Sequence, residues 1–339
     1  MSADIHLPLP WQDKVWQQLQ RNIAHGTVPH ALLFSGIAGV GKLTFALALC
    51  QRFLCAQPVN QVACGQCKSC LLIRAGNHPD LQVVSLEEKS QAIKIDQIRA
   101  LVNGLVKTPQ IGAWHCVVLH PADCLNINAA NALLKLLEEP PGDAVIILIS
   151  AHPQRLPATI RSRCRKISLD IPPLDVATTW LQDQGVQAEA SAQVLAAAHG
   201  APLRALALFR GQGLAEQEAL AKLLAGVLSR HTAASDAASH LGNCDEREVI
   251  DYMLDVLAFA AGCSGDSVYL GSGLRAQLES VVDPLPVFQF YDKLLTIKRQ
   301  LLSTANPNKQ LLWEECLLDW QALLKQASRP TSGAINDAN

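Results

Sequence analysis

The chain has 339 residues, of which 49% are hydrophobic and 17% charged, and its formal net charge is −2. This length suits two or three domains of roughly 100–200 residues each. The small negative charge excludes strong long-range attraction of the whole molecule to nucleic acid. No apolar run reaches the about 18 residues that a transmembrane helix needs, and the first residues lack the basic and apolar regions of a secretory signal. We therefore expect a cytoplasmic protein with no membrane partner.

A glycine-rich loop lies near the start of the chain, between the apolar run Ala31–Phe34 and the helical pattern Leu43–Leu54. It matches the pattern G-x-x-x-x-G-K, and a strand before it and a helix after it form the context of a phosphate-binding loop. In such a loop, glycines allow backbone N–H groups to surround phosphate oxygens, and a lysine reaches the terminal phosphates. The predicted nucleotide-binding residues of the loop are Gly36, Gly39, Gly41 and Lys42.

Leu43 occupies the position at which this loop needs Ser or Thr, whose hydroxyl binds magnesium. Thr44 comes one residue too late and would point to another side of the helix. A second part of the hydrolytic apparatus is also altered. The apolar run Trp114–Leu119 is followed by His120 and Pro121, where an active ATPase has Asp and Glu. ATP or ADP could bind to this loop, but we expect it not to be hydrolysed.

An autonomous, weakly active ATPase stays an alternative, in which a shifted carboxylate such as Asp123 replaces the missing pair. Against it, proline has no side chain that accepts a proton, and histidine is a poor substitute for a magnesium-binding carboxylate. ATP turnover by the purified chain, alone and after Leu43→Thr, distinguishes the two hypotheses, because a non-hydrolysing subunit has none alone.

The sequence contains 11 cysteines. Most are scattered in apolar surroundings, where a reducing compartment favours small core residues over disulfides: Cys50, Cys116, Cys244, Cys263 and Cys316. Four others form the pattern C-x8-C-x2-C-x2-C, namely Cys55, Cys64, Cys67 and Cys70. Four thiolates at this spacing predict a closed, structural zinc site. Iron–sulfur ligation and unligated thiols stay open as alternatives. So does a DNA-binding zinc ribbon, although the module contains only Lys68 as a basic residue and no interleaved aromatics.

Short apolar runs alternate with helical patterns over the first half of the chain. The predicted strands are Ala31–Phe34, Leu81–Leu86, His115–Leu119, Ala144–Ser150 and Lys166–Leu169. Between them, helices are expected over 95–105 and over Ala129–Glu139, the second capped by Asn126 or Asn128 and ended by Pro140 and Pro141. This alternation predicts an α/β domain, residues 1–171, with a parallel sheet covered by helices on both faces.

Strand patterns end at Pro172 and Pro173, and the remainder is predicted to be helical. A small helical domain, residues 172–212, and an all-helical domain, residues 213–327, would follow, and the polar tail 328–339 is expected to be disordered. The predicted helices are Asp175–Gln184, Ala188–His199, Pro202–Arg210, Leu214–Arg230, Glu246–Ala261, Gly273–Val281, Val287–Thr304 and Lys309–Lys325.

Longer motifs accompany the loop and the cysteines, and the last of them ends in Ser-Arg-Cys: His30–Gly36, Asn77–Asp80, Ile93–Arg99, Asn131–Pro141 and Leu156–Cys164. With these motifs the chain resembles the clamp-loader branch of the AAA+ ATPases, strongly so over Pro29–Leu169. The segment 306–312 also resembles the C-terminal collar segment of that family. The resemblance implies an AAA+ domain with a zinc-module insert, a small helical lid domain and an all-α C-terminal collar domain.

The resemblance also implies roles for two arginines. In this family the arginine of the Ser-Arg-Cys motif, here Arg163, enters the ATP site of a neighbouring subunit as an arginine finger. Such a finger accelerates phosphoryl transfer on the order of 10³–10⁵-fold. The alternative is that Arg163 forms an ordinary surface ion pair. Arg204 matches the lid-domain arginine that touches nucleotide in active relatives.

The implied function is that of a non-hydrolysing stator subunit in a replicative clamp loader. Its partners would be ATPase subunits of the gamma/tau type, a delta-type subunit, the ring-shaped sliding clamp (beta) and primed DNA, the last two through the complex. Direct contact with DNA is an open question at this stage. The candidates Lys94 and Arg99, and the basic edge at Arg161, Arg165 and Lys166, could equally be solvated residues.

Overall fold

The computed structural model describes residues 8–87, 90, 92–106, 108–211, 213–242, 244, 246–262, 270–279, 283–301 and 309–327. The tail 328–339 and residues 306–308 of the segment 306–312 lie outside the described residues. The chain divides into two compact units. The first comprises the described residues up to Asp183 together with Ala201–Arg204, and the second comprises Gln184–Gly200 and the described residues from Ala205 onward. The predicted domain boundaries at 171 and 212 stay predictions.

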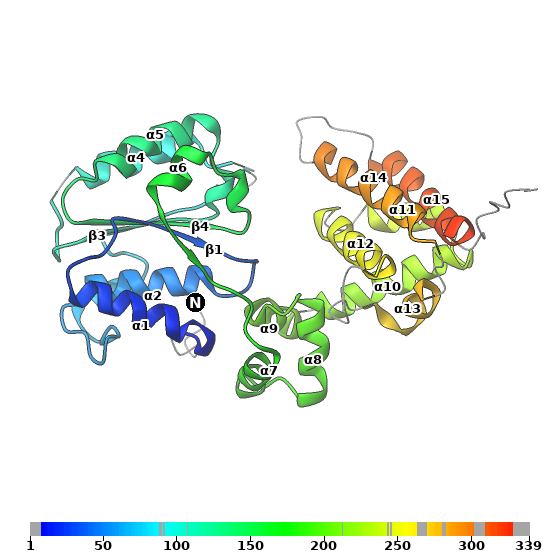
Figure 1. Ribbon diagram of the computed structural model, residues 1–339, viewed down its shortest axis with the longest axis horizontal. Helices are drawn as coiled ribbons and strands as arrows, with labels where there is room; N and C mark the ends of the chain where they lie inside the picture. Colours follow the sequence, from blue (N-terminus) through cyan, green and yellow to red (C-terminus); the bar gives the residue numbers. More distant parts are fainter. Residues whose placement is uncertain are drawn as a thin grey trace, which may run out of the picture. The chain divides into compact units, whose positions relative to one another are not determined.

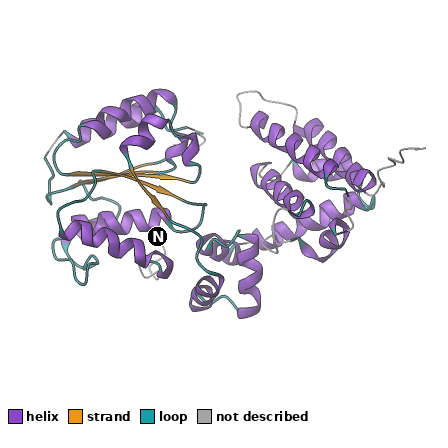
Figure 2. Ribbon diagram, viewed as in Figure 1, coloured by secondary structure: helices purple, strands orange, loops and turns teal. Residues whose placement is uncertain are grey.

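The first unit is built on a parallel sheet, whose strands are orange in Figure 2. The strand order is β2-β3-β4-β1-β5. Every side chain of β3 and β4 is buried. A strand covered on both faces needs apolar residues throughout, and this explains the continuous runs in the sequence. The strands span Ala31–Ser35 (β1), Leu81–Val84 (β2), His115–Leu119 (β3), Ala144–Ser150 (β4) and Arg165–Ser168 (β5), which confirms the predicted set.

Helices cover both faces of the sheet (Figure 1). Successive side chains of a strand point to opposite faces, so Leu32 and Phe34 of β1 join one apolar core while Leu33 joins the other. On the first face lie α1 (Asp13–Ala24) and α2 (Lys42–Leu54), and on the second lie α4 (Ile95–Leu105), α5 (Ile127–Glu138) and α6 (Ala158–Arg163). The predictions did not include α1, α6 or the short helix α3 (Lys68–Arg74).

The ends of α5 are set by local chemistry. Asn126, one of the two predicted caps, accepts a hydrogen bond from the backbone N–H of Ala129 at 2.8 Å. Such a cap contributes about 1 kcal/mol to stability. The helix ends at Glu138, just before Pro140, which cannot continue a helix. Glu138 is therefore held at a fixed end of α5.

The second unit is helical throughout its described residues. Trp313 and Trp320 lie at the centre of its core, and Trp320 Nε1 donates a hydrogen bond to the carbonyl of Leu224 at 3.0 Å. The helices from residue 174 onward are α7 (Leu174–Asp183, in the first unit), α8 (Ala188–Ala197), α9 (Pro202–Arg210), α10 (Gly213–Leu228), α11 (Ala234–Leu241), α12 (Glu246–Ala260), α13 (Gly271–Leu278), α14 (Leu285–Leu301) and α15 (Lys309–Ala327). Of these, only α11 was not predicted.

The scattered cysteines test the prediction of small core residues. Cys50, Cys116 and Cys316 are buried, as expected. Cys244 is exposed, so the prediction is wrong for it, because it lies in the connection after α11 and not on a packed helix face. Cys263 lies outside the described residues. Within the part of the chain that the structure describes, no single helix is both long and apolar enough to span a membrane.

Candidate functional site

The predicted phosphate loop connects β1 to α2 and needs its glycines for two reasons. Gly36, Gly39 and Gly41 have φ angles of 142°, 86° and 91°, which side chains rarely allow. A Cβ on Gly39 would also lie 2.5 Å from the Cβ of Arg204, and a Cβ on Gly41 would lie 2.6 Å from Leu9 Cδ1. The structure therefore brings Arg204, at the start of α9, against the loop. Whether this set binds nucleotide stays a prediction.

Lys42 is turned back onto its own loop. Only 6% of the residue is exposed, and its Nζ donates hydrogen bonds to the carbonyls of Gly36 at 2.7 Å and Ile37 at 2.6 Å. Burial lowers the pKa of Lys42 to about 8, although the nearby charge of Asp123 acts in the opposite direction. The ammonium group thus contacts two backbone carbonyls of its own loop.

The outer side of the loop is held by other parts of the first unit. Trp11 Nε1 and Gln12 Nε2 donate hydrogen bonds to the carbonyl of Val40 at 3.0 and 3.1 Å. The backbone N–H of Leu203 donates to the carbonyl of Gly39 at 3.0 Å. These contacts were not predicted, since Trp11 and Leu203 are remote from the loop in sequence. They connect the loop to the residues just before α1 and to α9.

The two positions that should bind magnesium carry other chemistry. Leu43 packs against the apolar core between the sheet and α2, so its side chain faces the core. His120, just after β3, is half-buried, and burial lowers its pKa, with the charge of Lys42 acting in the same direction. Asp123, the shifted carboxylate, accepts a hydrogen bond from Ser150 Oγ at 2.7 Å. Neither predicted magnesium position offers a hydroxyl or a carboxylate.

The Ser-Arg-Cys motif covers the end of α6 and the residue Cys164, which connects this helix to β5. Ser162 Oγ and Arg163 Nη1 both donate hydrogen bonds to the carbonyl of Thr159, at 3.1 and 2.9 Å. Cys164 is buried in the core under α5, and burial raises its pKa to about 11. The Arg163 side chain is 37% exposed, and its Nη2 lies 2.5 Å from Glu138 Oε1. Within this chain the predicted ion pair is thus present, and the role in a neighbouring subunit stays a prediction.

The four clustered cysteines converge on one point. Their Sγ atoms all lie within 4.8 Å of one another. A zinc ion about 2.3 Å from each sulfur would place the sulfurs about 3.8 Å apart. Backbone N–H groups of Cys64 and Cys67 donate to the sulfurs of Cys55 and Cys64 at 3.3 and 3.4 Å. Such bonds lower the pKa of Cys64, whereas burial raises the pKa of Cys55 despite its bond. The four residues could therefore hold a single metal ion.

The Asn77–Asp80 motif joins the cysteine module to the sheet. Ser69 Oγ lies 2.6 Å from His78 Nε2, and His78 Nδ1 accepts a hydrogen bond from the backbone N–H of Asp80 at 3.1 Å. Burial lowers the pKa of His78, although the charge of Asp80 opposes this effect. The Asp80 carboxylate accepts from the backbone N–H groups of Gln110 at 2.7 Å and Ile111 at 2.9 Å. The motif thus fixes the module against β2 and the loop before β3.

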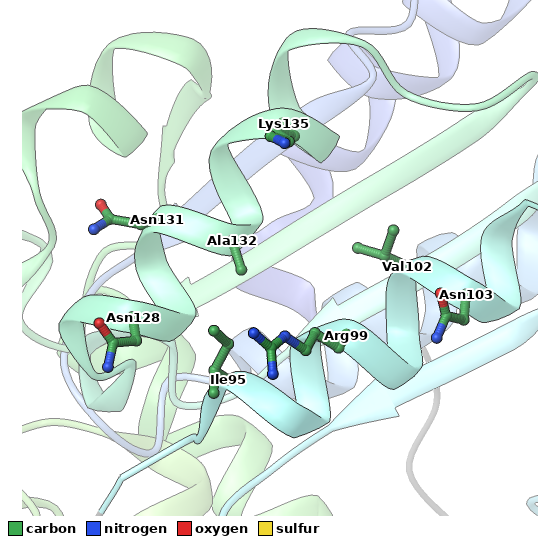
Figure 3. Close-up of a pocket in the computed structure, with 8 residues that line it drawn as sticks. All are labelled: Ile95, Arg99, Val102, Asn103, Asn128, Asn131, Ala132 and Lys135. Carbon is green, nitrogen blue, oxygen red and sulfur yellow. The ribbon is translucent and has the colours of Figure 1, made fainter.

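A groove of about 590 Å³, lined by both apolar and polar side chains, lies between α4 and α5 (Figure 3). Arg99 extends from α4 into it, and Asn128, Asn131 and Lys135 follow one another along α5. Arg99 Nη1 is 3.4 Å from Asp96 Oδ1, but both side chains are largely exposed, so this pair is weak. The groove presents two cations and several amides, which are groups that bind phosphodiester oxygens.

A glycine loop between the first strand and the following helix of a five-stranded parallel sheet defines an α/β domain of the phosphate-loop type. The family model described as "DNA polymerase III, delta subunit" matches residues 11–173. The model described as "DNA polymerase III, delta subunit, C terminal" matches residues 249–322.

Named relatives extend this match over most of the chain. "DNA polymerase III subunit delta'" of Pseudomonas aeruginosa is 37% identical over 333 residues, which cover 95% of this chain and 98% of the relative. The protein of the same name from Escherichia coli K12 is 32% identical over 313 residues, 91% and 94% of the two chains. The chain belongs to the DNA polymerase III subunit delta' family. "DNA polymerase III subunit tau" of E. coli is 34% identical over 158 residues, 47% of this chain and 24% of the relative.

Proposed function

We propose that the chain is the non-hydrolysing stator subunit of a clamp loader and donates Arg163 to the ATP site of a neighbouring ATPase subunit. The observation that carries the proposal is a contrast. Leu43 and His120 leave the chain's own site without magnesium ligands, whereas Arg163 stands exposed on an intact Ser-Arg-Cys motif. A guanidinium there neutralises charge that develops on the transferred phosphoryl group. The chain then serves hydrolysis in trans during loading of the sliding clamp onto primed DNA.

The remaining parts are assigned in the same framework. The cysteine module holds structural zinc, since four sulfurs leave no coordination position for a reactant. The region 172–212 acts as the lid and 213–327 as the collar that binds gamma/tau-type and delta-type subunits in the cytoplasm. Support for the collar comes from apolar side chains exposed on α14 and α15, namely Leu285, Phe288 and Leu318. A clamp and DNA would be met through the complex.

Purified chain is expected to show no ATP turnover, and Leu43→Thr is expected not to create any. The added hydroxyl restores one magnesium ligand, but His120 and Pro121 still provide neither a magnesium carboxylate nor a base for water. A coupled phosphate-release assay measures the rate, with Lys42→Ala as the control for contaminating ATPases. Turnover that disappears in Lys42→Ala would contradict the proposal and favour an autonomous ATPase that uses Asp123.

The groove between α4 and α5 is proposed to contact the phosphate backbone of primed DNA. Lys135→Ala in the reconstituted loader should weaken DNA binding about two- to fivefold and reduce the slope of log affinity against log salt by about one. The matched control is Lys68→Ala, an exposed lysine in the cysteine module. If fluorescence anisotropy shows an effect for Lys68 and none for Lys135, the groove is not the contact and the zinc-ribbon alternative gains support.

A further inference from the structure

We propose that Glu138 is a positioning residue for Arg163. Its carboxylate holds the guanidinium of Arg163 in the orientation in which it reaches the ATP of the neighbouring subunit. This inference rests on the proposed function and assigns a role that the Ser-Arg-Cys motif alone does not contain. Glu138 ends α5, whereas Arg163 ends α6, and the two residues are 25 positions apart in the sequence. The link between them exists only in the folded chain.

The guanidinium is held at two of its nitrogens. Nη2 lies 2.5 Å from Glu138 Oε1 at the end of α5, and Nη1 donates to the carbonyl of Thr159 in α6 at 2.9 Å. A guanidinium carries five N–H donors in one rigid plane. These two contacts therefore define the plane and leave other donors, on a side chain that is 37% exposed, to meet a phosphate.

Both supports are themselves rigid. Leu136 and Leu137, just before Glu138, are buried in the core under α5, and the N–H of Glu139 donates to the carbonyl of Lys135 at 3.0 Å. On the other helix, Ile160 is fully buried in the same core. An arginine without such a frame would distribute over many rotamers, and ordering it in the transition state would slow the reaction.

Because both side chains of the ion pair are exposed, a role in positioning Arg163 can be distinguished from a role in fold stability. The side chains of Arg163 and Glu138 are 37% and 47% exposed, and ion pairs of this kind contribute little to fold stability. Loss of the pair should therefore leave folding unchanged. Its effect should appear in the rate of the neighbouring site.

The test uses the loader reconstituted with primed DNA and clamp, and compares wild type, Glu138→Gln, Arg163→Ala and the double variant. Glu138→Gln is expected to lower kcat for DNA-stimulated ATP hydrolysis two- to fivefold with KM for ATP unchanged, because the finger acts in the transition state. In the Arg163→Ala background the same substitution should change nothing. Glu139→Gln, the exposed neighbouring carboxylate, is the matched control and should equal wild type.

The outcomes separate this inference from the proposed function. If Arg163→Ala itself leaves ATP hydrolysis unchanged, the trans-acting role fails and the positioning role fails with it. If Arg163→Ala slows hydrolysis but Glu138→Gln equals wild type, only the positioning role is overturned. An equal slowing by Glu138→Gln in both backgrounds also overturns it, since Glu138 would then act independently of Arg163. A faster rate in Glu138→Gln would show that the carboxylate restrains the finger, which contradicts positioning.

Discussion

Arg163→Ala is expected to lower ATP hydrolysis at the site that the chain faces by about 10³-fold or more, while the chain itself folds and assembles normally. The guanidinium would lie beside the transferred phosphoryl group and neutralise the charge that develops there. Alanine removes the positive charge of the guanidinium. It leaves Cys164 buried in the core and keeps the hydrogen bond from Ser162 to the carbonyl of Thr159. The measurement is single-turnover ATP hydrolysis by the reconstituted loader with primed DNA, beside the steady-state rate and beside the chain alone.

Arg165→Ala is the control for this variant, because Arg165 is also exposed and lies two positions further along the chain. A purely electrostatic effect of the basic edge would slow both variants alike, whereas a finger requires Arg163 specifically. Unchanged hydrolysis in the complex with Arg163→Ala would remove the trans-acting role. Clamp loading onto primed DNA should fall together with hydrolysis, because the loader would stall with ATP in one site.

The glycines of the loop show why a phosphate-loop pattern does not by itself establish nucleotide hydrolysis. Gly39 and Gly41 are required here by contact with Arg204 and Leu9, since any Cβ would lie within 2.6 Å of a side-chain carbon. Lys42 has polar partners in its own loop. The pattern G-x-x-x-x-G-K is thus compatible with a structural connection between β1, α2 and α9. Leu43, which faces the core, is the residue that distinguishes such a structural loop from a loop that binds magnesium and hydrolyses nucleotide.

The strands β1, β3 and β4 could be predicted from the sequence because they are buried and leave continuous apolar runs, whereas the edge strands β2 and β5 are partly exposed and leave weaker signals. The helix α11 could not, because its buried side chains are Ala237, Ala238 and Leu241, which give a weak periodic signal. The helix α1 carries Trp16 and Leu19 at helical spacing, so its sequence does contain a periodic apolar signal. Periodicity therefore finds elements with large apolar side chains more readily than those packed through alanine.

For the candidate sites, what could be predicted depended on how far apart their residues lie in the sequence. Motifs whose members are close in sequence, such as the cysteine pattern and the phosphate loop, could be predicted as local groups. Contacts between remote segments could not, and these include Glu138 with Arg163 and Trp11 with Val40. Each depends on how helices lie against the sheet, which spacing along the chain does not specify.

Removal of the metal is expected to unfold the cysteine module and lower the free energy of unfolding by several kcal/mol. The loop between Cys55 and Cys67 has little apolar material of its own: Val59 is 60% exposed, and its described backbone pairing is a bridge to Val62. Cys70→Ser should remove one ligand and with it about one zinc per chain. The measurements are metal content by mass spectrometry and urea unfolding with and without chelator at neutral pH.

The control is Cys244→Ser, since that cysteine is exposed and lies outside the cluster, and it should change neither metal content nor stability. Loss of structure should spread from the module to the Asn77–Asp80 motif, because Ser69 lies in α3 beside Cys70 and bonds to His78. The central strands β3 and β4 should keep their protection from hydrogen exchange, since their burial does not depend on the module. Metal-free protein with unchanged urea unfolding would rule out a structural metal, and iron with visible absorbance would favour the iron–sulfur alternative.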